Sequence, residues 1–124
     1  MDIGVWMTPD TLASKLEHQD EKNPEAAWNM AKWPKGFTGD TKIQNRLFVA
    51  SGGRWIGYFI ISQDMLYLPE DKKTPYVLLF NTRTWTQIDG GPVKRFRGFT
   101  YKVPQLVDGV WRVPDQTDTK KTDA

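Results

Sequence analysis

Short apolar runs rich in β-favouring residues recur over much of the chain between polar, glycine and proline segments, which is a pattern typical of β-strands. Two β-rich runs within residues 46–62 flank Ser51–Gly53, and this arrangement predicts an antiparallel hairpin that turns at these three residues. Residues 75–82 predict a further strand, and residues 83–88 are compatible with a strand or a turn. The middle of the chain is therefore expected to be β-structure.

A helical period appears only near the start of the chain. Residues 3–7 predict a short strand, and Leu12 and Leu16 then lie four residues apart on one face of a helix predicted over residues 8–18. Thr8 is suited to the N-cap of this helix, because its hydroxyl can accept a first-turn N–H and a proline follows it. One amphipathic helix is thus expected to precede the main group of strands.

The segments between this helix and the hairpin are less regular. Residues 26–33 are compatible with a strand that places Trp28, Met30 and Lys32 on one face, or with a short helix. Residues 34–45 contain a proline and two glycines and predict a loop.

The last third of the chain completes the expected fold. Residues 93–103 predict a strand with a bulge at Gly98, and residues 109–113 predict a final short strand. Residues 114–124 have almost nothing apolar to bury and predict a disordered tail. The expected fold class is α+β: a small mixed or antiparallel β-barrel of five to six strands, with one or two helices packed against it.

The composition excludes several kinds of site. The chain has 124 residues, no cysteine and one histidine, so disulfides, thiolate metal sites and Ser-His catalysis are not expected. It contains no recognisable signal peptide and no apolar stretch of membrane-spanning length, which predicts a cytoplasmic protein without a membrane partner. No cofactor and no metal site is predicted.

A basic and aromatic segment, residues 92–104, is the strongest candidate for function. In this segment, hereafter the basic strip, Lys94, Arg95 and Arg97 alternate with aromatic side chains and no acidic residue interrupts them. The strip is compatible with an edge strand that charge protects from aggregation. It is equally compatible with contacts to phosphates or bases, since arginine donates in pairs and stacks on bases.

Six tryptophans are spread along the chain, and they divide into two groups. Trp6 and Trp55 lie in predicted strands and are expected in the core. Trp28, Trp33 and Trp85 lie in irregular or polar segments and are better placed to stack on a base. The predicted nucleic-acid or nucleotide-binding residues are Trp28, Lys32, Trp33, Arg54, Trp85, Lys94, Arg95 and Arg97.

Four stretches, in their order along the chain, resemble the PUA-like superfamily, which includes the ASCH, EVE and YTH domains. Residues 5–9 (VWMTP) are similar to the opening strand and helix start of EVE-type domains, and Gly39-Asp40 resembles the turn before the barrel strand. Residues 46–62 resemble the central hairpin, with Gly57 at a position where such domains have glycine, and residues 96–101 (FRGFTY) resemble the closing strand.

The resemblance implies a single PUA-like domain over residues 1–113, with a cleft that holds a nucleobase or a short stretch of RNA or DNA. Related EVE and YTH domains read modified bases with an aromatic pocket, so the implied partner is RNA, DNA or a modified nucleotide. The function predicted is binding of such a ligand in a basic, aromatic-lined cleft, and enzymatic activity is left open.

Two other functions remain open at this stage. Some ASCH domains are amidohydrolases that act on a modified nucleoside, but their Gly-x-Lys-x-x-Glu-x-Arg signature is absent, and Lys32 with Glu25 is the one pair that could replace it. Neither Glu25 nor Asp64 is paired with a nucleophile in the sequence, so no catalytic residue is predicted. The third possibility is a protein-interaction module, for example a small inhibitor encoded by a phage or mobile element.

Overall fold

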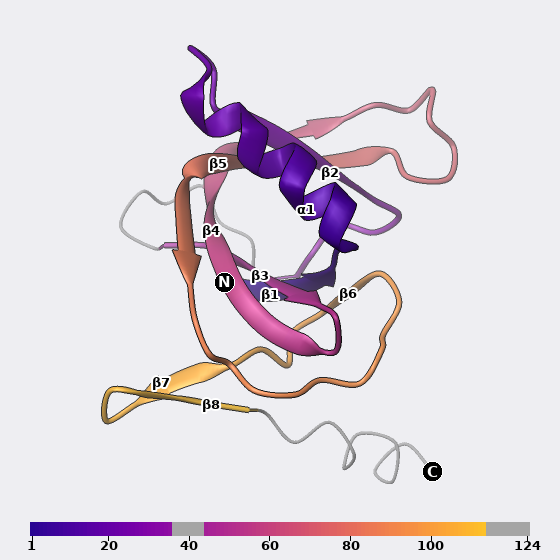
Figure 1. Cartoon of the computed structure of the whole chain (residues 1–124). Helices are drawn as coiled ribbons and strands as arrows, with labels where there is room; N and C mark the ends of the chain where they lie inside the picture. The colour runs from indigo at the N-terminus through magenta and orange to yellow at the C-terminus, as the bar shows by residue number, and fades with distance from the viewer. Residues whose placement is uncertain (36–43, 114–124) are drawn as a thin grey trace, which may run out of the picture.

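The protein is mostly β-structure with one short helix. The computed structural model describes residues 1–35 and 44–113, apart from the side chains of residues 63–65, so the predicted Gly39-Asp40 turn and the predicted tail at 114–124 lie outside the described residues (Figure 1). The helical elements are α1 (Pro9–Leu16) and a 3₁₀ turn, η1 (Glu17–Asp20). The strands are β1 (Asp2–Trp6), β2 (Glu25–Met30), β3 (Arg46–Ser51), β4 (Arg54–Tyr67), β5 (Tyr76–Gln87), β6 (Phe99–Thr100), β7 (Gln105–Val107) and β8 (Val110–Arg112).

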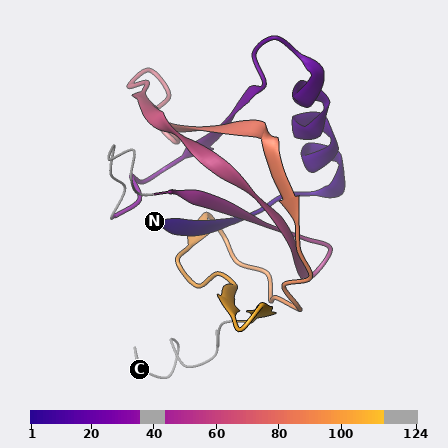
Figure 2. The same cartoon turned by 90° about the vertical axis from the view of Figure 1, so that its left-hand side faces the viewer.

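Six of the strands form one curled sheet in the order β2-β5-β4-β3-β1-β6 (Figure 2). The β1–β3 pair is parallel and the other pairs of this sheet are antiparallel, so the sheet is mixed. Its curl makes a half-barrel, with α1 lying across one end (Figure 1). The expected α+β class is confirmed, and the sheet is barrel-like in that it curls into half of a barrel.

Local sequence signals account for the central hairpin and the helix. Ser51 pairs with Arg54, and the two glycines between them have φ angles of 61° and 82°, which a type I′ turn requires. Thr8 is the N-cap of α1, and its Oγ1 accepts the backbone N–H of Thr11 at 3.2 Å. Both predictions are confirmed, although the α-helix ends at Leu16 and continues only as the 3₁₀ turn.

The two ambiguous segments are both strands. Residues 25–30 pair with β5 along their whole length, from Glu25 opposite Asn81 to Met30 opposite Tyr76. Residues 83–87 continue β5 and pair with β4 near Gly57. In each case a β-partner elsewhere in the chain selects between two local conformations that the sequence leaves open.

The concave side of the sheet and α1 enclose the inner core. Inward-facing side chains alternate along each strand, as in Leu47 and Val49 of β3 or Leu78 and Phe80 of β5, and all four are fully buried. Leu12 of α1 closes this core, which explains why the helix needs only one apolar stripe.

A second apolar cluster, the outer cluster, covers the convex side of β1, β3 and β4. Its buried members are Phe48, Ala50, Trp55, Val93 and Val103. The last two come from the basic strip, which therefore lies across the sheet. The predicted strand over 93–103 is wrong: only Phe99–Thr100 pair, with β1, because Val93, Phe96 and Val103 are spaced for packing against this surface and not for a ladder.

Two arginine–aspartate salt bridges differ in how far their side chains are exposed to solvent. Arg46 donates from Nη2 and Nε to Asp2 at 2.7 and 3.0 Å, and these side chains are 26% and 29% exposed. The hydrogen bonds to Asp2 raise the pKa of Arg46, and its guanidinium also lies 5.2 Å from the Phe48 ring centroid. Arg54 binds Asp89 at 2.8 Å, but those side chains are 54% and 87% exposed.

We expect Arg46→Ala to lower the free energy of unfolding by about 1–3 kcal/mol, because it removes a bidentate pair and a cation–π contact. Arg54→Ala should cost about 0–1 kcal/mol, since its charges remain solvated. Urea denaturation of both variants measures the difference. Equal losses would show that the contacts around Arg46 add nothing to its stabilising effect.

Candidate functional site

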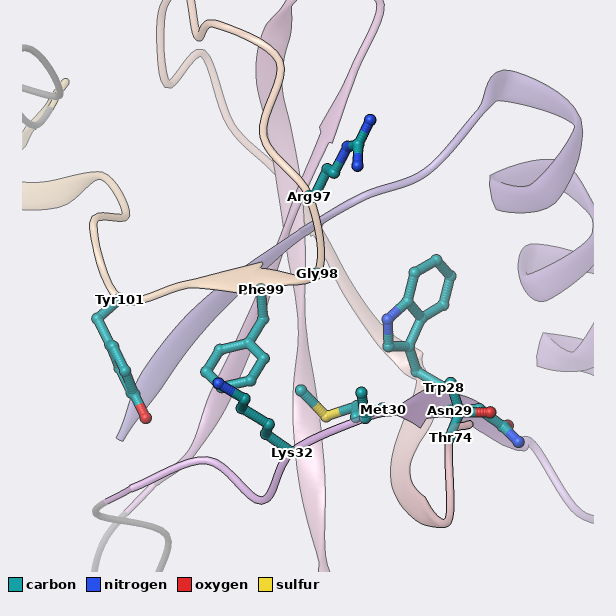
Figure 3. Close-up of a pocket in the computed structure, with 10 residues that line it drawn as sticks. Trp28, Asn29, Met30, Lys32, Thr74, Arg97, Gly98, Phe99 and Tyr101 are labelled. Atoms are coloured by element: carbon teal, nitrogen blue, oxygen red, sulfur yellow. The ribbon is translucent and has the colours of Figure 1, made fainter. Parts of the chain in front are cut away.

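A cavity of about 550 Å³ opens between the two edges of the curled sheet (Figure 3). One edge is β2 and the other is β6, which are the first and last strands in the sheet order. We call the space between these edges the seam. Side chains and backbone from β2, β6, their flanking segments and the β4–β5 loop line the cavity: Trp28, Asn29, Met30, Ala31, Lys32, Thr74, Arg97, Gly98, Phe99 and Tyr101.

The cavity exists because the sheet curls without closing. β6 contributes two residues, Phe99 and Thr100, and it pairs with β1 alone. Gly98, directly before β6, has a φ angle of 66°, a conformation that bends the chain sharply and favours glycine. The basic strip thus reaches the edge of the sheet through a bend and leaves a side-chain-lined gap in front of β2.

Apolar and aromatic side chains form the floor and walls of the cavity. Trp28 and Met30 lie on the same face of β2, because they are two residues apart in a strand. Phe99 is directly opposite Val5 of the inner core, so its ring also faces inward. In the view of Figure 3, Met30 lies between the Trp28 indole and the Phe99 ring. The site therefore presents two flat π-surfaces from opposite edges.

Cations stand at both edges of the cavity. Lys32 follows β2, Arg97 precedes β6, and both side chains are exposed. Figure 3 shows Lys32 reaching toward Phe99, whereas the Arg97 guanidinium points away from the Trp28 and Phe99 rings. An anion bound at the mouth would meet Lys32 at one edge, and Arg97 adds positive charge at the other edge.

Hydrogen bonds hold two polar groups at the cavity wall. The Tyr101 hydroxyl accepts the backbone N–H of Lys35 at 2.6 Å, which joins the two edges across the seam. The Asp71 carboxylate accepts the Thr74 backbone N–H at 3.0 Å and the Thr74 hydroxyl at 3.1 Å. These bonds hold the pKa of Asp71 below its ordinary value, and the bond from the backbone N–H has the larger effect. They also fix Thr74 in place.

No carboxylate lines the cavity within the parts of the chain that the structure describes. Glu25, the proposed partner of Lys32 in a hydrolase, lies at the far end of β2 and accepts a hydrogen bond from Ser62 Oγ at 2.7 Å. Lys32 lies beyond the other end of that strand, so the structure separates the pair. Among the described residues, therefore, no carboxylate stands beside Lys32 in the cavity.

The structure brings together three of the eight predicted site residues and places a fourth beside them. Trp28, Lys32 and Arg97 line the cavity. Trp33 lies next to Lys32 in the chain, is 39% exposed and makes an edge-to-face contact with Tyr76 at 5.2 Å between ring centroids.

The other four predicted residues have structural surroundings of their own. Trp85 packs on Phe59 of the inner core, with 4.8 Å between ring centroids. Arg54 is paired with Asp89, and the Arg95 guanidinium lies 4.9 Å from the Trp6 ring centroid on the outer cluster. Lys94 is exposed and does not line the cavity. The basic strip is thus divided, with Arg97 alone of its three predicted cations at the seam.

Sequence reasoning missed several lining residues: Asn29, Met30, Thr74, Phe99 and Tyr101. Strand alternation from Trp28 was sufficient to find Met30 once residues 25–30 were taken as a strand. Phe99 and Tyr101 were visible as aromatics of the strip, but nothing local indicated that they face β2. Thr74 had no signal in the sequence.

The fold and the site define this chain as a mostly β protein with a mixed, curled six-stranded sheet and an aromatic, cationic cavity at its seam. In comparisons with known proteins, the chain matches no family model, no curated protein and no solved structure. No helix among residues 1–35 and 44–113 is long and apolar enough to cross a membrane. Over the same residues, no cluster of histidine and acidic side chains is suited to hold a metal ion.

Proposed function

We propose that this chain is a small nucleic-acid- or nucleotide-binding domain of PUA-like fold, and that its seam cavity holds a base. The observation that carries the proposal is the combination, in one cavity, of the Trp28 and Phe99 rings with Lys32 and Arg97 at the two edges. Base–aromatic stacking tolerates any base, since each base has a π-face. Lysine and arginine side chains can form ion pairs with the phosphates of the nucleotide, which lie outside the stacked base.

The dimensions of the cavity support a ligand of this size. Its volume, about 550 Å³, lies inside the range of about 300–1,000 Å³ that is common for small-molecule sites. Asn29 and Thr74 add polar groups to the lining, with Asn29 on the face of β2 opposite Trp28 and the Thr74 hydroxyl donating to Asp71. Apolar surface, a few polar groups and flanking cations are together what recognition of a nucleotide requires.

The PUA-like assignment is part of this proposal. A mixed, curled sheet with one helix at its end supports it, as does the central β3–β4 hairpin that the resemblance anticipated. A hydrolase of the ASCH kind is not proposed, because Lys32 has no carboxylate partner among the described lining residues.

Binding can be tested by titrating the full chain with nucleoside monophosphates and with short single-stranded RNA and DNA at low salt. We expect quenching of tryptophan fluorescence as a base covers Trp28, and an affinity that falls as salt rises. Each phosphate contact should contribute about 0.7 to the slope of log affinity against log salt for single strands. Absence of binding to every mononucleotide and oligonucleotide at low salt would falsify the proposal.

A further inference from the structure

A row of aromatic side chains leads away from the seam cavity across the end of the sheet. Met30, which lines the cavity, is directly opposite Tyr76 on β5, and Tyr76 is directly opposite Tyr67 on β4. Residues directly opposite each other in an antiparallel pair project from the same face of a sheet. The three side chains therefore continue the cavity face over two strand spacings, or roughly 10 Å.

Contacts between the rings make this row continuous. The Tyr67 and Tyr76 ring centroids are 5.3 Å apart, and Trp33 meets Tyr76 edge to face at 5.2 Å. Tyr76 is half-buried between its two neighbours, and it also packs against the inner core. We call Trp33, Tyr76 and Tyr67 the aromatic row.

The outer members of the row are unusually exposed for aromatic side chains. Tyr67 is 58% exposed and Trp33 is 39% exposed, although both rings contact the half-buried Tyr76. Large aromatic side chains are usually more buried than this, and exposed ones that are held in place are typical of recognition surfaces. The row thus offers π-surface to a ligand without the need to rearrange.

Charge around the row favours a polyanion over a basic or neutral partner. Lys32 and Lys35 flank Trp33 in the chain, and both side chains are exposed. The β4–β5 loop, which projects beyond the sheet in Figure 1, adds Lys72 and Lys73 but also Glu70 and Asp71, so its own charges balance. The cationic excess at the row therefore comes from Lys32 and Lys35, which stand on either side of Trp33 in the chain.

On these grounds we propose that the ligand of the seam cavity is a single-stranded polynucleotide and not a free nucleotide, with the neighbouring bases stacking on Trp33 and Tyr67. The inference rests on the proposed function, since it extends the same site. It is supported by continuity of the row with the cavity lining and by the lysines beside it. A mononucleotide would fill the cavity but leave the row unused.

The test is the dependence of affinity on ligand length, measured for the full chain and for Tyr67→Ala by fluorescence or calorimetry. The probes are mononucleotides and homo-oligomers of increasing length, in parallel RNA and DNA series that decide which sugar is preferred. We expect affinity to rise with length in the unmodified protein. Tyr67→Ala should lower oligomer affinity by about 5- to 150-fold, the loss of one stacked base, and leave mononucleotide affinity unchanged.

Two control variants make the result specific. Tyr67→Phe keeps the ring and should keep the affinity for oligomers. Leu66→Ala changes the adjacent residue, which is 44% exposed and on the opposite face of β4, and should change nothing. A general loss of structure would affect all ligands alike, whereas loss of a stacking surface affects only the oligomers.

The possible failures are distinguishable. If mononucleotides bind but affinity does not rise with length, or if Tyr67→Ala binds oligomers normally, this inference is wrong while the proposed function stands, and the exposed row is then better suited to a protein partner. If neither mononucleotides nor oligomers bind, the proposed function and this inference are both wrong.

Discussion

Replacing Trp55 by alanine should lower the free energy of unfolding by about 3–5 kcal/mol, the loss typical of a large aromatic side chain in a packed core. Trp55 is 1% exposed and is the largest side chain of the outer cluster. Its ring lies over Gly4, where a Cβ atom would approach the indole to 2.4 Å, and it stacks on Phe96 at 5.7 Å between centroids. The ring therefore joins β1, β4 and the basic strip.

The same substitution should weaken ligand binding without touching the cavity. Trp55 packs against Phe96 in the segment that leads to β6, and β6 supplies the Phe99 wall of the seam. Loosening that segment removes a positioned ring from the site. Urea denaturation and nucleotide titration of the variant measure the two effects separately.

Two further variants serve as controls for Trp55. Trp33→Ala removes a tryptophan that is 39% exposed, and we expect a loss of about 1 kcal/mol or less. Trp55→Phe keeps an aromatic ring and removes an indole N–H that is buried with no partner in the described part of the chain, so it should cost less than half as much as alanine. A Trp55→Ala protein as stable as Trp33→Ala would contradict the role given to the outer cluster.

The second large effect is a loss of affinity for oligonucleotides. Its salt dependence distinguishes the loss of a stacking ring from the loss of a positive charge at the seam. Trp28→Ala should reduce affinity for single-stranded oligonucleotides by about 1–3 kcal/mol and leave the salt dependence unchanged, because stacking releases no counterions. Arg97→Ala should reduce affinity and also lower the slope of log affinity against log salt by about 0.7, the share of one phosphate contact. Fluorescence anisotropy at several salt concentrations records both quantities.

Arg95→Ala is the matched control for Arg97→Ala. The two arginines are two residues apart in the basic strip, and both side chains are exposed. Arg95 lies over Trp6 on the convex side, whereas Arg97 lines the cavity. Arg95→Ala should therefore leave the salt slope nearly unchanged, and equal slopes for the two variants would mean that the phosphate path does not follow the seam.

Elements with a local cause were predictable from the sequence. Thr8 caps α1 through a hydrogen bond to Thr11, three residues away, and Gly52-Gly53 supply the positive φ angles of the β3–β4 turn. The strand predicted over residues 109–113 is confirmed by β8, but its hairpin with β7 was missed, although Asp108-Gly109 has the same signal and φ angles of 52° and 78°. These features depend on a few neighbouring residues, so an isolated stretch of sequence is sufficient to specify them.

The path of the basic strip across the sheet could not be predicted from the residues of the strip alone. Its mixture of charged and aromatic residues was compatible with an edge strand, but its backbone pairs only at Phe99–Thr100. Val93, Phe96 and Val103 pack instead on the outer cluster, a surface built from β1, β3 and β4. No alternation within the strip could indicate that surface, because its residues come from other parts of the chain.

The sequence by itself thus determined the helix, the central hairpin, the mostly β composition and the supply of aromatic and cationic side chains for a site. Only the tertiary structure decided that Trp28, Lys32 and Arg97 share one cavity while Arg54, Trp85 and Arg95 are used elsewhere. The physical reason is the curl of the sheet: it brings together its two edges, β2 and β6, which are remote in the chain and are not paired with each other. Side-chain burial over the whole sheet sets that curl, and no single segment encodes it.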